Sequence, residues 1–99
     1  SIKKEDTLKD LDSYINRQMA GLKDIYNMKG EYVEIKKDKD EFLGETRTYI
    51  SLHANIYGHD LYERAVYLKV GNYIAEIYAF AGDELSAKQM IDTISKIEE

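Results

Sequence analysis

The chain has 99 residues, of which 43% are hydrophobic, 33% are charged and nine are tyrosines. This composition is too apolar and too aromatic for a disordered segment, and the length suits one domain, residues 1–99, with a single core. The formal net charge of −5 opposes binding to nucleic acid or to anionic lipid. The absence of cysteine excludes disulfides, thiol catalysis and cysteine-ligated metal centres.

Residues 7–28 have the period of an amphipathic helix. Their apolar positions recur at intervals of three and four: Leu8, Leu11, Ile15, Met19, Leu22 and Ile25. Thr7 is suited to be the N-cap, and Gly30 follows the last periodic residue as a stop signal.

The period changes to two after Gly30, which predicts strands over 31–37 and 45–57 with a turn over 37–44 between them. The strand over 45–57 has the clearest alternation. We expect its core face to consist of Thr46, Thr48, Ile50, Leu52, Ala54 and Ile56.

A third strand is predicted over 61–70 and a fourth over 73–81. In the third strand the apolar residues change from one alternating set of positions to the other near Ala65, which is typical of a β-bulge. Gly71 and Asn72 suit a two-residue hairpin turn. Both alternating sets of 73–81 are largely apolar, which favours an inner strand that is covered on both faces.

A closing helix is predicted over 86–98. Ser86 and Gln89 have the spacing of a capping box, and Leu85 and Met90 that of a hydrophobic staple. The fold class is therefore α+β, in the order helix, four-stranded antiparallel sheet, helix, with the helices packed on the sheet. The predicted core comprises Leu11, Ile15, Leu22, Ile50, Leu52, Ile56, Ile77, Ile91 and Ile94.

The sequence shows no arrangement of residues that is typical of catalysis. Its histidines are His53, on the more polar face of the second strand, and His59, in a turn. With Asp60 and Glu63 they give an alternative interpretation, a small metal-binding or enzymatic domain, but their spacing matches no specific motif. The six glycines do not cluster into a phosphate-binding loop. We therefore predict no catalytic residue, no metal ligand and no cofactor.

Tyrosines are the most informative polar residues. Tyr49 and Tyr57 share the non-core side of the second strand with His53, beside Arg47 and Asn55. Tyrosines often cover a half-buried sheet, so this side can be structural. If it is open to solvent, these five residues form an aromatic surface with a polar rim, which is typical of a protein interface.

Four segments resemble the DcrB and PsbP-like domains. They are the run from Leu11 to Met19, the turn from Phe42 to Glu45, the hairpin from Tyr67 to Ile74, and the closing helix. The resemblance spans Thr7 to Ile97. It implies an antiparallel sheet with helices against its faces, and strands before the first long helix, which are not found in this sequence. It supplies no catalytic residues.

The resemblance implies a non-catalytic binding or assembly domain, the soluble part of a bacterial cell-envelope lipoprotein. The expected partner is a protein or peptide, with no nucleic acid and no membrane insertion by this segment, and the expected state is a monomer or weak dimer. Since the chain begins with Ser1, a leader, anchor or first element could precede it. The alternative is a cytoplasmic secretion adaptor that binds an apolar protein segment.

Overall fold

The computed structural model describes residues 2–4, 11–28 and 32–97. The elements are β1 (Ile2–Lys4), α1 (Leu11–Met28), β2 (Tyr32–Phe42), β3 (Glu45–Ile56), β4 (His59–Val70), β5 (Tyr73–Ala81) and α2 (Glu84–Ile97). The described strands form one antiparallel sheet in the order β1-β5-β4-β3-β2. The predicted order of helix, four strands and helix is confirmed. β1 adds a strand before α1, which the sequence pattern missed because three residues are too short to show a period.

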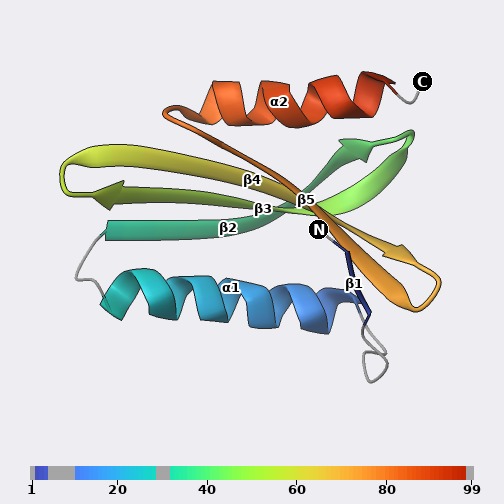
Figure 1. The fold of residues 1–99 in the computed structure, drawn as a ribbon, viewed down its shortest axis with the longest axis horizontal. Helices are drawn as coiled ribbons and strands as arrows, with labels where there is room; N and C mark the ends of the chain where they lie inside the picture. The colour runs from blue at the N-terminus through green and yellow to red at the C-terminus, as the bar shows by residue number, and fades with distance from the viewer. Residues whose placement is uncertain (1, 5–10, 29–31, 98–99) are drawn as a thin grey trace.

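The sheet lies between the two helices, with α1 against one face and α2 against the other (Figure 1). We call these the α1 face and the α2 face. The buried cluster on the α1 face consists of Tyr14, Ile15, Ile50, Ala65, Tyr67 and Ile74. That on the α2 face consists of Phe42, Tyr49, Val66, Leu68, Ala79 and Ile91. The chain therefore has two core layers in place of the single core that its length suggested.

β2 is longer than predicted, because residues 37–42 continue the strand and pair with β3 as far as Phe42 and Glu45. These residues are charged on both faces, since β2 is an edge strand, and therefore show no alternation. The true turn has two residues, Leu43 and Gly44, with φ of 52° and 79°. Two consecutive positive φ angles are typical of a type I′ hairpin turn.

β4 contains no bulge. Its register is continuous from Thr48↔Tyr67 to Ile56↔His59 on one side and from Tyr62↔Ala81 to Val70↔Tyr73 on the other. The change of phase near Ala65 arises because both sheet faces are covered, so consecutive residues such as Ala65 and Val66 are buried in opposite layers. The predicted hairpin at Gly71 and Asn72 is confirmed.

α2 begins two residues before the predicted start. Asp83 is the N-cap: its Oδ1 accepts a hydrogen bond from the Ser86 backbone N–H at 2.7 Å, and its Oδ2 accepts one from Ser86 Oγ at 2.9 Å. These bonds lower the pKa of the Asp83 carboxyl. Ser86 is therefore inside the first turn, and the capping box with Gln89 is wrong. Leu85 and Met90 are 64% and 51% exposed and form no staple that buries them.

Of the nine predicted core residues, four are buried, four are partly buried and one is exposed. Ile15, Ile50, Leu52 and Ile91 are buried. Leu11, Leu22, Ile56 and Ile77 are half-buried. Ile94 is 39% exposed and is a wrong prediction, because α2 buries the stripe Ala87, Ile91 and Ser95. Thr7, Leu8 and Gly30, which the sequence places at the ends of the first helix, lie outside the described residues.

Candidate functional site

Tyr49 is part of the α2-face core and is only 1% exposed. It packs in the same cluster as Ile91 of α2, and its hydroxyl donates a hydrogen bond to the Glu41 backbone oxygen at 3.1 Å. Burial raises the pKa of the Tyr49 phenol to about 12. Its proposed place on an open surface is therefore wrong, because α2 covers this part of β3.

The other four predicted residues lie in three separate places. Arg47 lies near the start of β3, where its guanidinium pairs with Glu45 at 2.7 Å. Tyr57 is 88% exposed in the turn between β3 and β4, with φ of 51°. Only His53 and Asn55 lie close together, and both contact Asp60.

Three aromatic side chains from neighbouring strands form an aromatic ladder on the α2 face. The rings of His53 and Tyr62 are stacked, with centroids 4.2 Å apart and planes 5° apart. Tyr32 meets His53 edge-on, with centroids 5.4 Å apart. We use the name aromatic ladder for Tyr32, His53 and Tyr62. Tyr32 is 53% exposed, so the end of the ladder on β2 is open to solvent.

Hydrogen bonds fix the orientation of the His53 ring. Its Nε2 lies 2.9 Å from Asp60 Oδ1, and Asn55 Nδ2 donates to the same oxygen at 3.1 Å. The bond from His53 is the main cause that lowers the pKa of the Asp60 carboxyl, followed by that from Asn55. Because an ionised carboxylate only accepts, the proton in this bond belongs to His53 Nε2. The imidazole is thus held flat against Tyr62.

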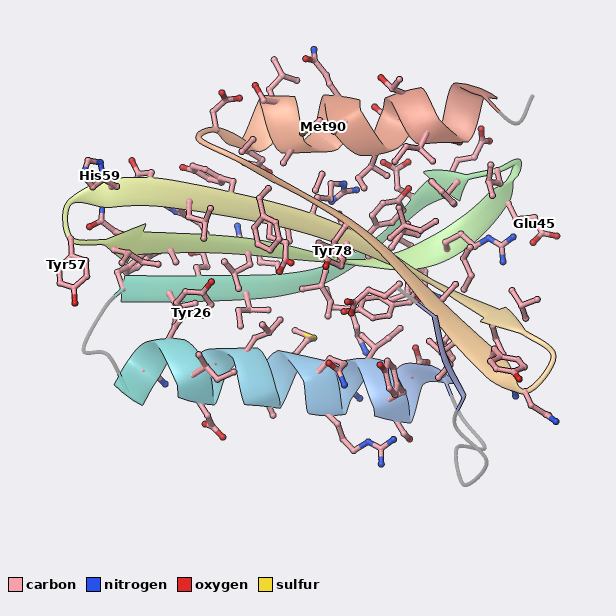
Figure 2. The ribbon with its side chains drawn as sticks, in the orientation of Figure 1. Tyr26, Glu45, Tyr57, His59, Tyr78 and Met90 are labelled. Atoms are coloured by element: carbon pink, nitrogen blue, oxygen red, sulfur yellow. The ribbon has the colours of Figure 1, made fainter. Side chains whose placement is uncertain are left out.

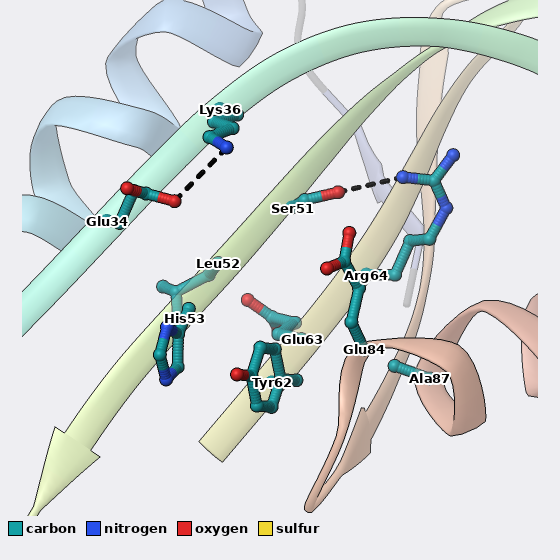
Figure 3. Close-up of a pocket in the computed structure, with 10 residues that line it drawn as sticks. All are labelled: Glu34, Lys36, Ser51, Leu52, His53, Tyr62, Glu63, Arg64, Glu84 and Ala87. Atoms are coloured by element: carbon teal, nitrogen blue, oxygen red, sulfur yellow. Dashed lines mark hydrogen bonds and ion pairs between the residues drawn. The ribbon is translucent and has the colours of Figure 1, made fainter. Parts of the chain in front are cut away.

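A pocket of ≈ 120 Å³ lies between the aromatic ladder and the start of α2 (Figure 3). Its lining consists of Glu34, Lys36, Ser51, Leu52, His53, Tyr62, Glu63, Arg64, Glu84 and Ala87. Pockets that bind cofactors or drug-sized ligands usually measure about 300–1,000 Å³. This pocket has room for one side chain. The Glu34 and Lys36 ion pair at its rim, with oxygen and nitrogen 3.3 Å apart, lowers the pKa of Glu34.

Arg64 lines the same pocket, two residues after Tyr62 on β4, and the sequence does not predict it as a site residue. It is 8% exposed. Its guanidinium donates to Ser51 Oγ at 2.8 Å, lies 3.4 Å from Asp40 Oδ2, and sits 4.1 Å above the centre of the Tyr49 ring. The only signal in the sequence is that Arg64 directly precedes the apolar run from Ala65 to Leu68. Tyr32 and Tyr62 were also missed, because their proximity to His53 depends on strand register.

The four residues of the alternative site, His53, His59, Asp60 and Glu63, do not come together on one face of the sheet. His53 and Asp60 lie on the α2 face, whereas His59 and Glu63 alternate to the α1 face. Within residues 2–4, 11–28 and 32–97, no group of three or more histidine and acidic side chains is placed to hold a metal ion. Burial, and secondly Glu76, raises the pKa of Glu63 to about 7.

Comparison of the chain with family models, curated proteins and solved structures gave no match. Among the residues that the structure describes, no helix is long and apolar enough to cross a membrane.

Proposed function

We propose that the domain is a non-catalytic protein-binding domain and that the aromatic ladder is its contact surface. The observation that supports this most is the combination of three adjacent aromatic rings, one of them half exposed, with a pocket of ≈ 120 Å³. Rigid aromatic side chains supply large contact area at a low entropic cost, and they are enriched in the centres of protein interfaces.

The surroundings of the aromatic ladder suit a protein partner better than a small molecule. The pocket can receive one side chain of the partner, while the ion pair of Glu34 and Lys36 and the carboxylate of Asp60 provide a polar rim. The hydrogen bond from Arg64 to Ser51 joins β4 to β3 beside the rings, and β2, β3 and β4 pair in continuous register, so the rings are arranged before binding. A preorganised surface loses little conformational entropy on association.

The location of the domain is a separate proposal. The resemblance to DcrB and PsbP-like domains supports a cell-envelope protein, and a signal peptide or lipobox cysteine in the complete reading frame would agree with it. A cytoplasmic adaptor would lack both. The aromatic ladder would serve as the contact surface in either location.

Site-specific photo-crosslinking tests the proposed contact surface. A benzophenone amino acid replaces Tyr32 in one variant and Tyr73 in a control variant; these tyrosines are 53% and 45% exposed, respectively. We expect irradiation in cells to attach a discrete protein to the Tyr32 variant and not to the Tyr73 variant. Equal labelling of both variants, or no labelling at Tyr32, would argue against the aromatic ladder as the interface.

A further inference from the structure

The two cations that line the pocket beside the aromatic ladder already have counter-ions. Lys36 Nζ lies 3.3 Å from Glu34 Oε1. The Arg64 guanidinium lies 3.5 Å from Asp38 Oδ2 and 3.4 Å from Asp40 Oδ2. Since two aspartates share one arginine, these ion pairs keep an excess of negative charge. Within the described part of the chain, the pocket therefore offers no unpaired cation to an anionic group of a partner.

Glu84 contributes a carboxylate that lacks such a pair. It belongs to the first turn of α2, and Figure 3 shows its side chain extending from the helix toward the strands that line the pocket. No lysine, arginine or histidine within residues 2–4, 11–28 and 32–97 forms an ion pair with it. The remaining acid of the lining, Glu63, has its side chain on the α1 face. Glu84 is therefore the carboxylate that faces a pocket occupant without a counter-ion of its own.

Tyr62 gives the pocket an aromatic wall. The His53 ring stacks on one face of the Tyr62 ring, with centroids 4.2 Å apart. On the other side, the residue of β5 that pairs with Tyr62 is Ala81, whose methyl group is too small to cover an aromatic ring. Tyr62 and Glu84 line the same pocket. A cation between them would meet the negative face of a ring and a carboxylate at the same time.

These charges decide which kind of partner side chain suits the pocket. An acidic side chain would be repelled by Glu84 and by the two aspartates beside Arg64. An apolar side chain would remove water from Glu84 without replacing its hydrogen bonds, which is costly. A lysine or arginine side chain compensates the charge, and its methylene groups can pack against Tyr62 and Ala87. A basic side chain is thus the occupant with the best complementarity.

We infer that the pocket receives a lysine or arginine side chain of the partner protein, with Glu84 as the counter-ion and Tyr62 as the wall against which the cation packs. This inference rests on the proposed function, because it identifies the part of the partner that enters the pocket. The formal net charge of −5 agrees with it, since an acidic domain attracts a basic segment at long range.

Titration of the ¹⁵N-labelled domain with a short peptide tests the inference without the partner. The probe is an acetylated and amidated pentapeptide with a central arginine between serine and glycine residues. The control contains citrulline, which has nearly the same shape as arginine but no charge. We expect the arginine peptide to shift the amide resonances of Tyr62, Glu84 and Ala87 saturably, with a Kd on the order of 10 mM, or about −2.7 kcal/mol. A lysine peptide should shift the same resonances, and the citrulline peptide should not.

A matched pair of variants locates the peptide. Glu84→Gln removes the charge and keeps the shape of the side chain, and it should weaken arginine-peptide binding at least about threefold, as expected for loss of a partly exposed ion pair. Glu45→Gln removes the same charge from an ion pair with Arg47, and it should leave binding unchanged. Figure 2 shows Glu45 at the end of the sheet away from Tyr57 and His59. Melting curves establish that both variants fold.

Three results of the titration would overturn the inference: no saturable shift, equal shifts with the citrulline peptide, or equal affinity of the wild type and Glu84→Gln. Glu84→Gln in the crosslinking variant at Tyr32 separates the inference from the proposed function. A lower yield of the crosslinked protein would support the inference. An unchanged yield would overturn it and leave the aromatic ladder as the interface. Arginine-peptide binding without any crosslinked protein would uphold the preference of the pocket and argue against the proposed function.

Discussion

Arg64 links three strands through a single side chain. It reaches Ser51 on β3 and Asp38 and Asp40 on β2 from its own place on β4, and its guanidinium covers the Tyr49 ring. The two aspartate side chains are 52% and 43% exposed, so water screens these ion pairs. The bond to Ser51 and the contact with Tyr49 are less exposed and should contribute more to stability.

Replacement of Arg64 measures this contribution. Arg64→Ala removes the hydrogen bond to Ser51 and the stacking on Tyr49, which together should cost about 1–3 kcal/mol in the free energy of unfolding. Arg64→Lys retains the charge but loses the planar fork, and should give an intermediate loss. Urea denaturation measures both. A change below about 0.5 kcal/mol in Arg64→Ala would show that the residue is dispensable for stability.

α2 determines which side chains of the sheet are free to bind. It covers Tyr49 but leaves the aromatic ladder open, and its own C-terminal half is tied to the turn between β2 and β3, because Ser95 Oγ accepts a hydrogen bond from the Leu43 N–H at 2.9 Å. The exposed flank with Met90 and Ile94 follows from the rotation of the same helix. Access to the aromatic ladder thus depends on the position of α2 on the sheet.

Alanine substitutions in α2 test its orientation. Ile91 is fully buried, so Ile91→Ala should cost about 2–5 kcal/mol through lost burial and the cavity left behind. Ile94→Ala removes a side chain that is 39% exposed and should cost clearly less. Melting temperatures of the two variants provide the comparison. A larger loss in Ile94→Ala than in Ile91→Ala would mean that the opposite flank of α2 is buried.

The sequence predicts the structure best where one physical signal dominates. Strict alternation in β3 predicted the buried face of Ile50, Leu52 and Ala54, because only one register buries all of them. The burial of Tyr49 could not be predicted from the alternation in β3, because it depends on where α2 packs. The start of α2 was misplaced because Asp83 and Ser86 are both good N-cap residues, and only the hydrogen bonds distinguish them.

At the scale of the whole molecule, the sheet buries residues on both faces. An acidic side chain that is partly buried there is therefore costly to ionise. Glu63 lies on the α1 face, and its pKa is raised to about 7 from the ordinary 4.5, first by burial and then by Glu76. The folded state therefore binds the Glu63 proton more tightly than the unfolded state does. The contribution of Glu63 to the free energy of unfolding is fully present below about pH 4.5 and is lost as the pH rises through 7.

Glu63→Gln should remove this dependence on pH. Between pH 5 and pH 8 the wild-type domain should lose about 1–2 kcal/mol through Glu63, after allowance for its partial exposure, and the variant should lose less. Melting temperatures at the two pH values measure the difference. Glu34→Gln is the control, because the pKa of Glu34 is lowered and its titration lies below this range. An identical pH dependence of wild type and Glu63→Gln would refute the assignment.

The affinity of the domain for the protein that is crosslinked at Tyr32 tests the central claim most directly. His53→Ala removes the middle ring of the aromatic ladder, and we predict at least about a tenfold rise in Kd, or ~1.4 kcal/mol, with little change in the melting temperature. Tyr57→Ala, at a tyrosine that is 88% exposed and outside the aromatic ladder, should leave the Kd unchanged. An unchanged Kd for a folded His53→Ala variant would contradict the claim that the aromatic ladder is the binding surface.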